Sequence, residues 1–216
     1  MKPSNFKRYF FVSVTLSIFI FASLNVAAVN FSPDEKEKLK AGQTIRKPLA
    51  SSGQKGFYGG SGYTLIDAPV DVVWQAIQDF ESYHRVFDAT ADVRQVARKG
   101  NISMIRYQMG YKMINLEYYL EVNLDEANHT MSFSLLEDKP HDIDMARGYW
   151  KLFAQPGNRT LVAYVVSAKV PMGVINLLSE STNRTVERNL IGAPHDIKKW
   201  LATASGKKYY TRTARK

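Results

Sequence analysis

The chain has 216 residues, of which 45% are hydrophobic, and a formal net charge of +9, so its length fits one domain with extensions. It contains no cysteine, which excludes disulfides, thiolate metal sites, cysteine nucleophiles and the cysteine-linked lipid of a bacterial lipoprotein. A basic balance is compatible with a nucleic acid or an anionic membrane as partner, and equally with a soluble protein that has a basic surface and tail.

The first 28 residues have the pattern of a secretory signal peptide. Three basic residues precede an apolar stretch over 10–24, and the small residues at 26–28 offer a cleavage site after Ala28. Cleavage would remove those three basic residues and no acids, so that the charge of +9 falls to +6. We therefore expect an exported protein, periplasmic or secreted. The alternative is an uncleaved anchor over 9–28, because about 20 apolar residues span a bilayer.

Residues 29–61 are expected to form a short helix and a connector. Ser32 and Glu35 form a capping box, and Pro33 takes the first helical position. The helix should end near Lys40, before Gly42. The stretch over 44–62 is polar and rich in glycine, serine and lysine, which predicts a connector lying on the surface.

Residues 62–87 begin the predicted domain. A short strand is expected over Tyr63–Ile66, followed by a helix with Pro69 in its first turn. A second short helix is expected over Phe80–Phe87. The apolar positions of the first helix recur at helical spacing. They are Val70, Val73, Trp74 and Ile77.

A run of strands follows, each with an alternation of apolar and polar residues. In residues 114–124 every second residue is apolar, while the residues between them are polar or tyrosine. The other strands are expected at 102–111, 130–136, 146–152 and 160–168. This order predicts an antiparallel meander.

The last predicted element is one long amphipathic helix over 175–205. Its apolar positions recur at steps of three or four, and Pro194 should bend or interrupt it. We expect Val186, Leu190, Ile197 and Trp200 to be buried against the sheet. The fold class is then α+β, with a curved sheet wrapped around this helix and a basic tail over 206–216.

Three stretches of the chain resemble the START-like superfamily, and most closely its polyketide cyclase/dehydrase and coenzyme-Q-binding branch (the SRPBCC type). Residues 63–74 are similar to the opening of that domain, Gly148-Tyr149-Trp150 to its Gly-x-Trp strand, and residues 160–164 to its Thr-x-x-x-Tyr strand. The resemblance covers 62–205. It implies a helix-grip fold, in which a bent antiparallel sheet holds the C-terminal helix around a deep apolar cavity.

No pattern in the chain indicates catalysis or metal binding. There is no G-x-S-x-G motif, and the four histidines lack metal-ligand spacing. The acid-rich segment His141–Asp144 lies in a predicted turn, where a solvated turn is the simpler interpretation. We predict no catalytic residues, no metal and no cofactor. Basic and aromatic residues are not interleaved on one sheet face, so we predict no nucleic-acid partner.

Aromatic residues on apolar strand faces are the candidate ligand-binding residues. Pattern alone is compatible with a packed core in which the tyrosine hydroxyls are bonded locally. The resemblance implies instead that they line a cavity, which polar groups on the helix would also reach. The candidates are Tyr107, Tyr118, Trp150, Tyr164, Thr182 and Asn189.

Two functions compete for this cavity. In the first, the protein is an exported binding or carrier protein for a hydrophobic small molecule such as a lipid, a quinone or a polyketide-like compound, with peripheral membrane contact possible. In the second, it is an enzyme similar to polyketide cyclases and aromatases. The second needs a general base, and His84 is the histidine nearest to the expected mouth. We favour the carrier.

Overall fold

The computed structural model describes residues 30–49, 56–111, 114–177 and 180–213, without the side chains at 111, 180–183 and 212–213. The chain divides into two units, Met1–Phe31 and Ser32–Lys216, and all elements described below belong to the second. The predicted signal peptide lies outside the described residues. Within the described residues, the helices are too short or too polar to cross a membrane.

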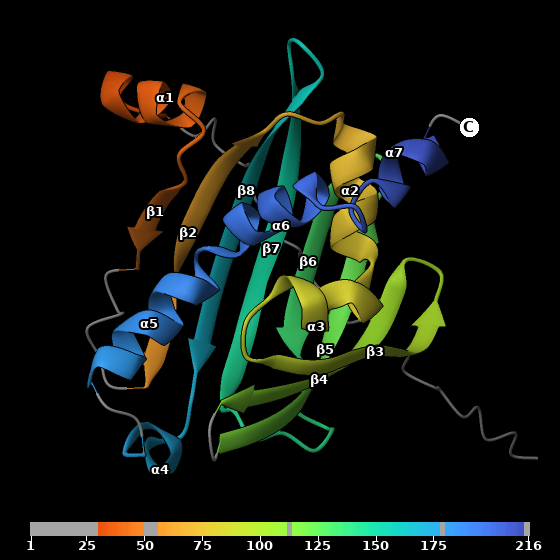
Figure 1. Cartoon of the computed structure of the whole chain (residues 1–216). Helices are drawn as coiled ribbons and strands as arrows, with labels where there is room; N and C mark the ends of the chain where they lie inside the picture. The colour runs from red at the N-terminus through yellow and green to blue at the C-terminus, as the bar shows by residue number, and fades with distance from the viewer. Residues whose placement is uncertain (1–29, 50–55, 112–113, 178–179, 214–216) are drawn as a thin grey trace, which may run out of the picture. The chain divides into compact units, whose positions relative to one another are not determined.

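An eight-stranded antiparallel sheet with helices on one face forms the domain (Figure 1). The spatial order of the strands is β1-β2-β8-β7-β6-β5-β4-β3. The strands are β1 Ile45–Pro48, β2 Phe57–Ile66, β3 Thr90–Lys99, β4 Ile102–Tyr111, β5 Ile114–Asp125, β6 Thr130–Leu135, β7 Met145–Gln155 and β8 Arg159–Lys169. The helices are α1 Pro33–Lys40, α2 Val70–Gln78, η2 Phe80–Ser82, α3 Tyr83–Val86, α4 Met172–Ile175, α5 Glu180–Leu190, α6 Ala193–Ala202 and α7 Lys208–Thr213. The predicted α+β architecture is confirmed.

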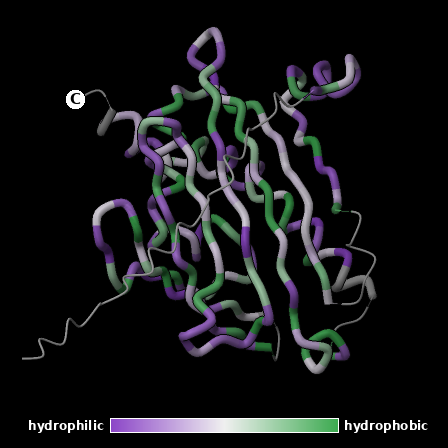
Figure 2. Tube along the Cα trace, turned by 180° about the vertical axis from the view of Figure 1, so that it is seen from behind, coloured by the Kyte–Doolittle hydropathy of each residue, from purple (hydrophilic) through white to green (hydrophobic). Residues whose placement is uncertain are grey.

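The alternation of the strands separates two faces of the sheet. In β5, Leu120, Val122 and Leu124 are buried on the inner face, which faces the helices, while Glu121 is exposed on the outer face. The outer face, seen from behind in Figure 2, mixes hydrophilic and hydrophobic positions. The meander predicted from 102 to 168 is therefore confirmed, with strand ends within a few residues of those expected.

The expected surface connector over 44–62 is wrong. Its described residues include β1 and the first half of β2, and these two strands pair with each other at the edge of the sheet. Glycines in this segment indicated a loop, but in the structure they serve close packing. A Cβ on Gly62 would lie 2.1 Å from the carbonyl oxygen of Ile191, so only glycine lets the α5–α6 junction approach the strand so closely.

The C-terminal helix is interrupted, as Pro194 predicts. α5 ends at Leu190, and α6 begins at Ala193 with the proline in its first turn. On α6, Ile197 and Trp200 are buried as expected, whereas Val186 and Leu190 on α5 are only half-buried. The sheet therefore holds α6 more firmly than α5.

The basic tail expected over 206–216 contains a packed helix instead. Tyr209 of α7 has no exposed surface, and its hydroxyl donates to the carboxylate of Asp79 at 2.8 Å. The same carboxylate accepts from Lys208 at 2.5 Å and from the Ser82 hydroxyl at 2.9 Å. Charge suggested a loose segment, but one buried aromatic ring and one ion pair fasten it to α2 and η2.

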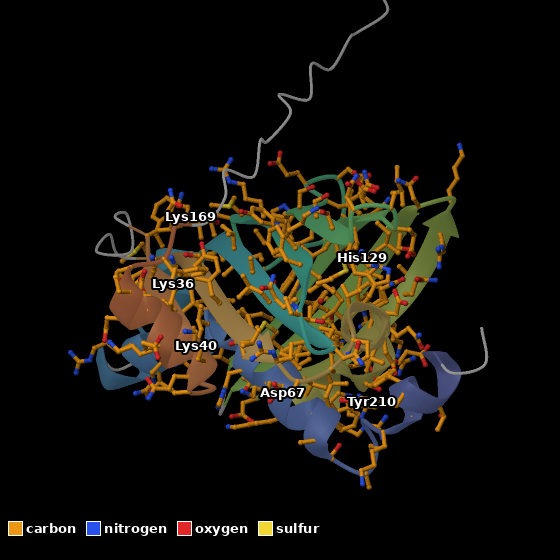
Figure 3. The ribbon with its side chains drawn as sticks, turned by 90° about the horizontal axis from the view of Figure 1, so that it is seen from above. Lys36, Lys40, Asp67, His129, Lys169 and Tyr210 are labelled. Carbon is orange, nitrogen blue, oxygen red and sulfur yellow. The ribbon has the colours of Figure 1, made fainter. Side chains whose placement is uncertain are left out.

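An electrostatic interaction also links α7 to the domain. Burial raises the pKa of Tyr210, and the carboxylate of Asp67 raises it further. Figure 3, seen from above, shows Asp67 and Tyr210 on the side of the sheet that carries α6 and α7. The last described helix therefore belongs to the layer that covers the inner face.

Protonation of Asp79 should weaken this cluster. Burial alone would raise its pKa, but the hydrogen bonds from Lys208, Tyr209 and Ser82 outweigh burial and hold the pKa below its ordinary value. The stabilisation is then complete above the unfolded-state pKa of about 3.9 and is lost as pH falls through the lower folded-state pKa. We expect Asp79→Asn to lower the free energy of unfolding at pH 7, and this deficit should shrink at about pH 3. Urea unfolding at both pH values measures it.

The matched control is Asp138→Asn, because that carboxylate is exposed and, in the described part of the chain, its ion pair is with Lys139, its neighbour in sequence. Its unfolding free energy should stay close to that of the unmodified chain at both pH values. If Asp79→Asn lowers the unfolding free energy by the same amount at pH 7 and pH 3, the ionised carboxylate of Asp79 is not the source of the stabilisation.

Candidate functional site

The register of the sheet places the four predicted aromatic residues on the inner face. Tyr164 pairs with Gly62, which contacts the helix junction, and Tyr164 also pairs with Trp150. Tyr107 pairs with Tyr118 on the neighbouring pair of strands. Since residues opposite each other in a sheet point to the same side, this pairing gives the four residues one common face with the helices.

Burial divides this inner face into two halves. The half under α2 is fully buried, for example at Val122, Leu124 and Leu152. Toward the other end of the strands the inner side chains still pack against the core but keep accessible surface. These half-buried residues are Tyr107, Leu116, Tyr118, Phe133 and Leu135.

The aromatic rings meet at the boundary between the two halves. Tyr107 and Tyr118 are stacked, with ring centroids 5.4 Å apart and planes 3° from parallel. The centroids of Trp150 and Tyr164 are 4.2 Å apart. Burial raises the pKa of Tyr107, and the nearby phenols of Tyr83, Tyr118 and Tyr164 raise it further. The structure therefore brings all four predicted aromatic residues into one cluster.

The hydroxyls of this cluster differ in their hydrogen bonding. Tyr83 donates to the carbonyl of Ile77, and Tyr118 contacts the sulfur of Met109 at 3.2 Å. Within the described residues, the hydroxyls of Tyr107 and Tyr164 make no hydrogen bond. Burial raises the pKa of Tyr164 as well, so both phenols are neutral at pH 7 and can donate or accept. Neither oxygen is among the fully buried side-chain atoms that lack a partner, so both hydroxyls keep some accessible surface and are open positions in an apolar surface.

Two residues of the cluster were missed by the sequence analysis. Tyr83 is buried, and its ring centroid lies 6.4 Å from that of Tyr107. Phe133 lies 6.2 Å from Tyr164, and it fills the space above Gly148, where a Cβ would lie 2.6 Å from the Phe133 ring. Two features of the sequence could have predicted this contact. One is the glycine of the Gly-x-Trp pattern, which leaves space above the strand, and the other is the apolar position of Phe133 on its own strand.

The other candidates lie elsewhere. Asn189 is exposed on α5 and has no contact with the four rings among the interactions of the described residues. The side chain of Thr182 lies outside the described residues. His84, the histidine considered as a general base, is exposed on α3, whereas Tyr83 beside it is buried. The cluster thus consists of aromatic side chains from the sheet and α3.

A cleft of about 410 Å³ lies at the half-buried end of the inner face. It is lined by Asn115, Leu116, His141, Asp142, Ile143, Asp144, Pro171 and Val174. Leu116 is two residues from Tyr118 on the same face of β5, so the cleft meets the inner face beside the cluster. Two polar groups of its loop are bonded within the protein: Asp142 accepts from the amide of Glu117 on β5 at 2.8 Å, and His141 contacts the carbonyl of Ile143 at 2.8 Å.

Ionisable groups other than tyrosine are missing from the inner face of strands β4 to β8, as far as the structure describes them. The described part of the chain also contains no group of three acidic, histidine or cysteine side chains that could hold a metal ion. The chemistry that this surface offers is therefore apolar contact, together with hydrogen bonds from neutral phenols.

The comparison with known families decides the identity. Residues 66–193 match the family described as polyketide cyclase/dehydrase and lipid transport. The chain belongs to this family. Its members bind hydrophobic small molecules. The START-like resemblance seen in the sequence is thus confirmed. No curated protein matches the chain.

Three solved structures share the fold of this chain at low sequence identity. A protein from Thermus thermophilus is 18% identical with a TM-score of 0.57, and the match covers 67% of this chain and 97% of that one. The aromatase/cyclase Zhui from Streptomyces sp. R1128 is 18% identical with a TM-score of 0.56, covering 69% and 98%. A STAR-related lipid transfer protein from Xanthomonas axonopodis is 12% identical with a TM-score of 0.54, covering 73% and 99%. At these identities the matches establish the fold.

Two tyrosine-to-phenylalanine variants should separate bonded from open hydroxyls. Tyr83→Phe removes the bond to the Ile77 carbonyl and leaves that buried acceptor without this donor, so it should cost about 1–2 kcal/mol of unfolding free energy. Tyr164→Phe removes a hydroxyl without a partner among the described residues, so it should change the unfolding free energy by less than about 0.5 kcal/mol. Chemical denaturation of the ligand-free protein measures both. A larger loss in Tyr164→Phe than in Tyr83→Phe would show that the Tyr164 hydroxyl is bonded within the protein.

Proposed function

We propose that the protein is an exported carrier of a hydrophobic small molecule that bears a polar group. The molecule would lie between the half-buried part of the inner face and the helices. The observation that carries this proposal is the pair of open hydroxyls, Tyr107 and Tyr164, within an otherwise apolar surface. Ligand sites combine mostly apolar lining with a few polar groups that fix orientation, and these two phenols fit that composition.

Accessible surface at buried positions supports a space for the ligand. Burial raises the pKa of Tyr107 and Tyr118, so protein surrounds both phenols, yet both side chains retain accessible surface. Accessible surface on these two inner-face side chains is where a ligand could make contact. The cleft at Leu116 and Ile143 is then the proposed entrance to that space.

Carrier function agrees better with this surface than catalysis does. Cyclisation of a poly-ketone needs proton transfer, which a positioned base assists. The described inner face of β4 to β8 has no carboxylate or imidazole, and His84 is exposed. Similarity in fold to the aromatase/cyclase Zhui keeps an enzyme as the alternative, in which the tyrosine hydroxyls would orient the carbonyl groups of a substrate.

Export and membrane contact complete the proposal. The pattern of residues 1–28 supports passage across a membrane, and a lipid, a quinone such as coenzyme Q or a polyketide-like compound is poorly soluble in the space beyond it. Beside the proposed entrance, Met172 and Leu177 are 44% and 73% exposed. Apolar side chains at this place would support peripheral contact with a bilayer during loading or release.

Binding of a lipophilic fluorophore with a polar end tests this proposal. The unmodified protein should bind it saturably. Tyr107→Phe and Tyr164→Phe should each weaken binding about fivefold, because each removes one hydrogen bond of about 1 kcal/mol. Displacement of the fluorophore by a quinone or a fatty acid then identifies the ligand class.

The matched control is Tyr119→Phe. Tyr119 neighbours Tyr118 on the opposite face of β5, where its hydroxyl contacts Glu117 at 3.3 Å. It should leave the affinity unchanged. Saturable binding that is weakened equally by all three variants, or no saturable binding at all, would contradict the proposed site.

A further inference from the structure

A second hollow of about 470 Å³ lies between β1 at the edge of the sheet and α5. Three of its lining residues are arginines, Arg46 from the strand and Arg184 and Arg188 from the helix, and one is an acid, Glu187. Three positive charges against one negative charge leave a net charge of +2. This groove shares no lining residue with the aromatic cluster or the cleft beside it.

Two of the arginines lack an ionic partner. Within the described residues, Arg46 and Arg188 form no ion pair with a carboxylate, and both side chains are exposed. The carboxylate oxygen Oε1 of Glu187 is buried and likewise has no hydrogen-bond partner there. Glu187 therefore does not neutralise Arg46 or Arg188 through an ion pair in the described part of the chain.

The backbone fixes the direction of Arg46. Its neighbour Ile45 is buried, and Arg46 itself pairs with Gly62 in the β1–β2 ladder. Its Nη2 atom lies 3.2 Å from the place that a Cβ on Gly192 would take. The missing side chain at the α5–α6 junction thus leaves room for the guanidinium.

The surroundings of the groove add positive charge. Burial lowers the pKa of His195, and the charges of Lys199, Arg46 and Lys198 lower it further. These side chains come from β1 and α6, so positive charge gathers around the α5–α6 junction from more than one element. Clustered cations of this kind raise the local concentration of anions.

We propose that this groove binds a phosphate group. A guanidinium offers paired donors that match the oxygens of a phosphate, and two such groups from different elements, Arg46 and Arg188, would hold it from two sides. The phosphate could be that of a lipid headgroup or of a free soluble phosphate. Both sources share the chemistry that the groove recognises, and an experiment can separate them.

The first experiment is calorimetric titration of the whole mature chain with inorganic phosphate. Arg46→Gln and Arg188→Gln should each weaken binding roughly tenfold, the equivalent of about 1.4 kcal/mol for a lost charged contact. Glu187→Gln should strengthen it, since it removes the like charge. Arg98→Gln is the matched control, because Arg98 lies at the far edge strand β3 and contacts only the carbonyl of Gly100 in the described structure.

The second experiment is co-sedimentation with vesicles of phosphatidylglycerol and of phosphatidylcholine. If Arg46→Gln and Arg188→Gln reduce co-sedimentation with phosphatidylglycerol vesicles and inorganic phosphate does not bind, the occupant is a lipid headgroup. If the two substitutions weaken binding of inorganic phosphate but not of vesicles, the occupant is a soluble phosphate. If Arg46→Gln and Arg188→Gln behave like Arg98→Gln in both experiments, the groove is not a phosphate site. Fluorophore binding in the cavity should stay unchanged in all four variants, so the outcome is independent of the proposed carrier function.

Discussion

The whole structure depends on an apolar inner face that the helices cover unevenly. α2 and α6 seal one half of it, where Val122, Leu152 and Ile197 are buried. The other half ends in rings and aliphatic side chains that keep accessible surface. Burial of the first half supplies the hydrophobic stabilisation on which a domain of this size relies. The second half keeps apolar surface, and covering it with an apolar molecule would lower the free energy.

Glycines set the spacing between the layers. Gly62 brings the α5–α6 junction onto the sheet, and Gly148 makes room for the ring of Phe133 beside Tyr164. In both places the close approach requires the missing side chain. Sheet, helix junction and aromatic cluster are thus positioned by the same two residues, which links the packing of the fold to the geometry of the candidate site.

Much of the fold followed from periodicity in the sequence. The alternation in 114–124 assigned both faces of β5, and Pro194 marked the break in the last helix. Composition misled where it was the main signal. The glycines of β2 indicated a loop, the basic residues of α7 indicated a free tail, and β3 was not predicted at all. In β2 and α7, tertiary contacts override local preference: pairing with β8 in the first case and burial of Tyr209 in the second.

Periodicity in the strands also made part of the candidate site predictable. Alternation assigned the four aromatic residues to apolar strand faces, and the family resemblance implied that these faces border a cavity. Tyr83 comes from a short helix whose contact with the sheet is long-range, and the state of each hydroxyl depends on atoms far away in the chain. The groove of Arg46 and Arg188 joins residues about 140 positions apart, which no local pattern reveals.

The most direct test of the central claim is mass spectrometry of the protein purified from its native host, first folded and then after extraction with organic solvent. The account predicts that the folded chain carries an additional mass, close to one molecule per chain, and that the extract contains an apolar compound with a polar group. A folded protein with the mass of the chain alone, together with an extract free of such compounds, would contradict the claim that the inner face borders a ligand site.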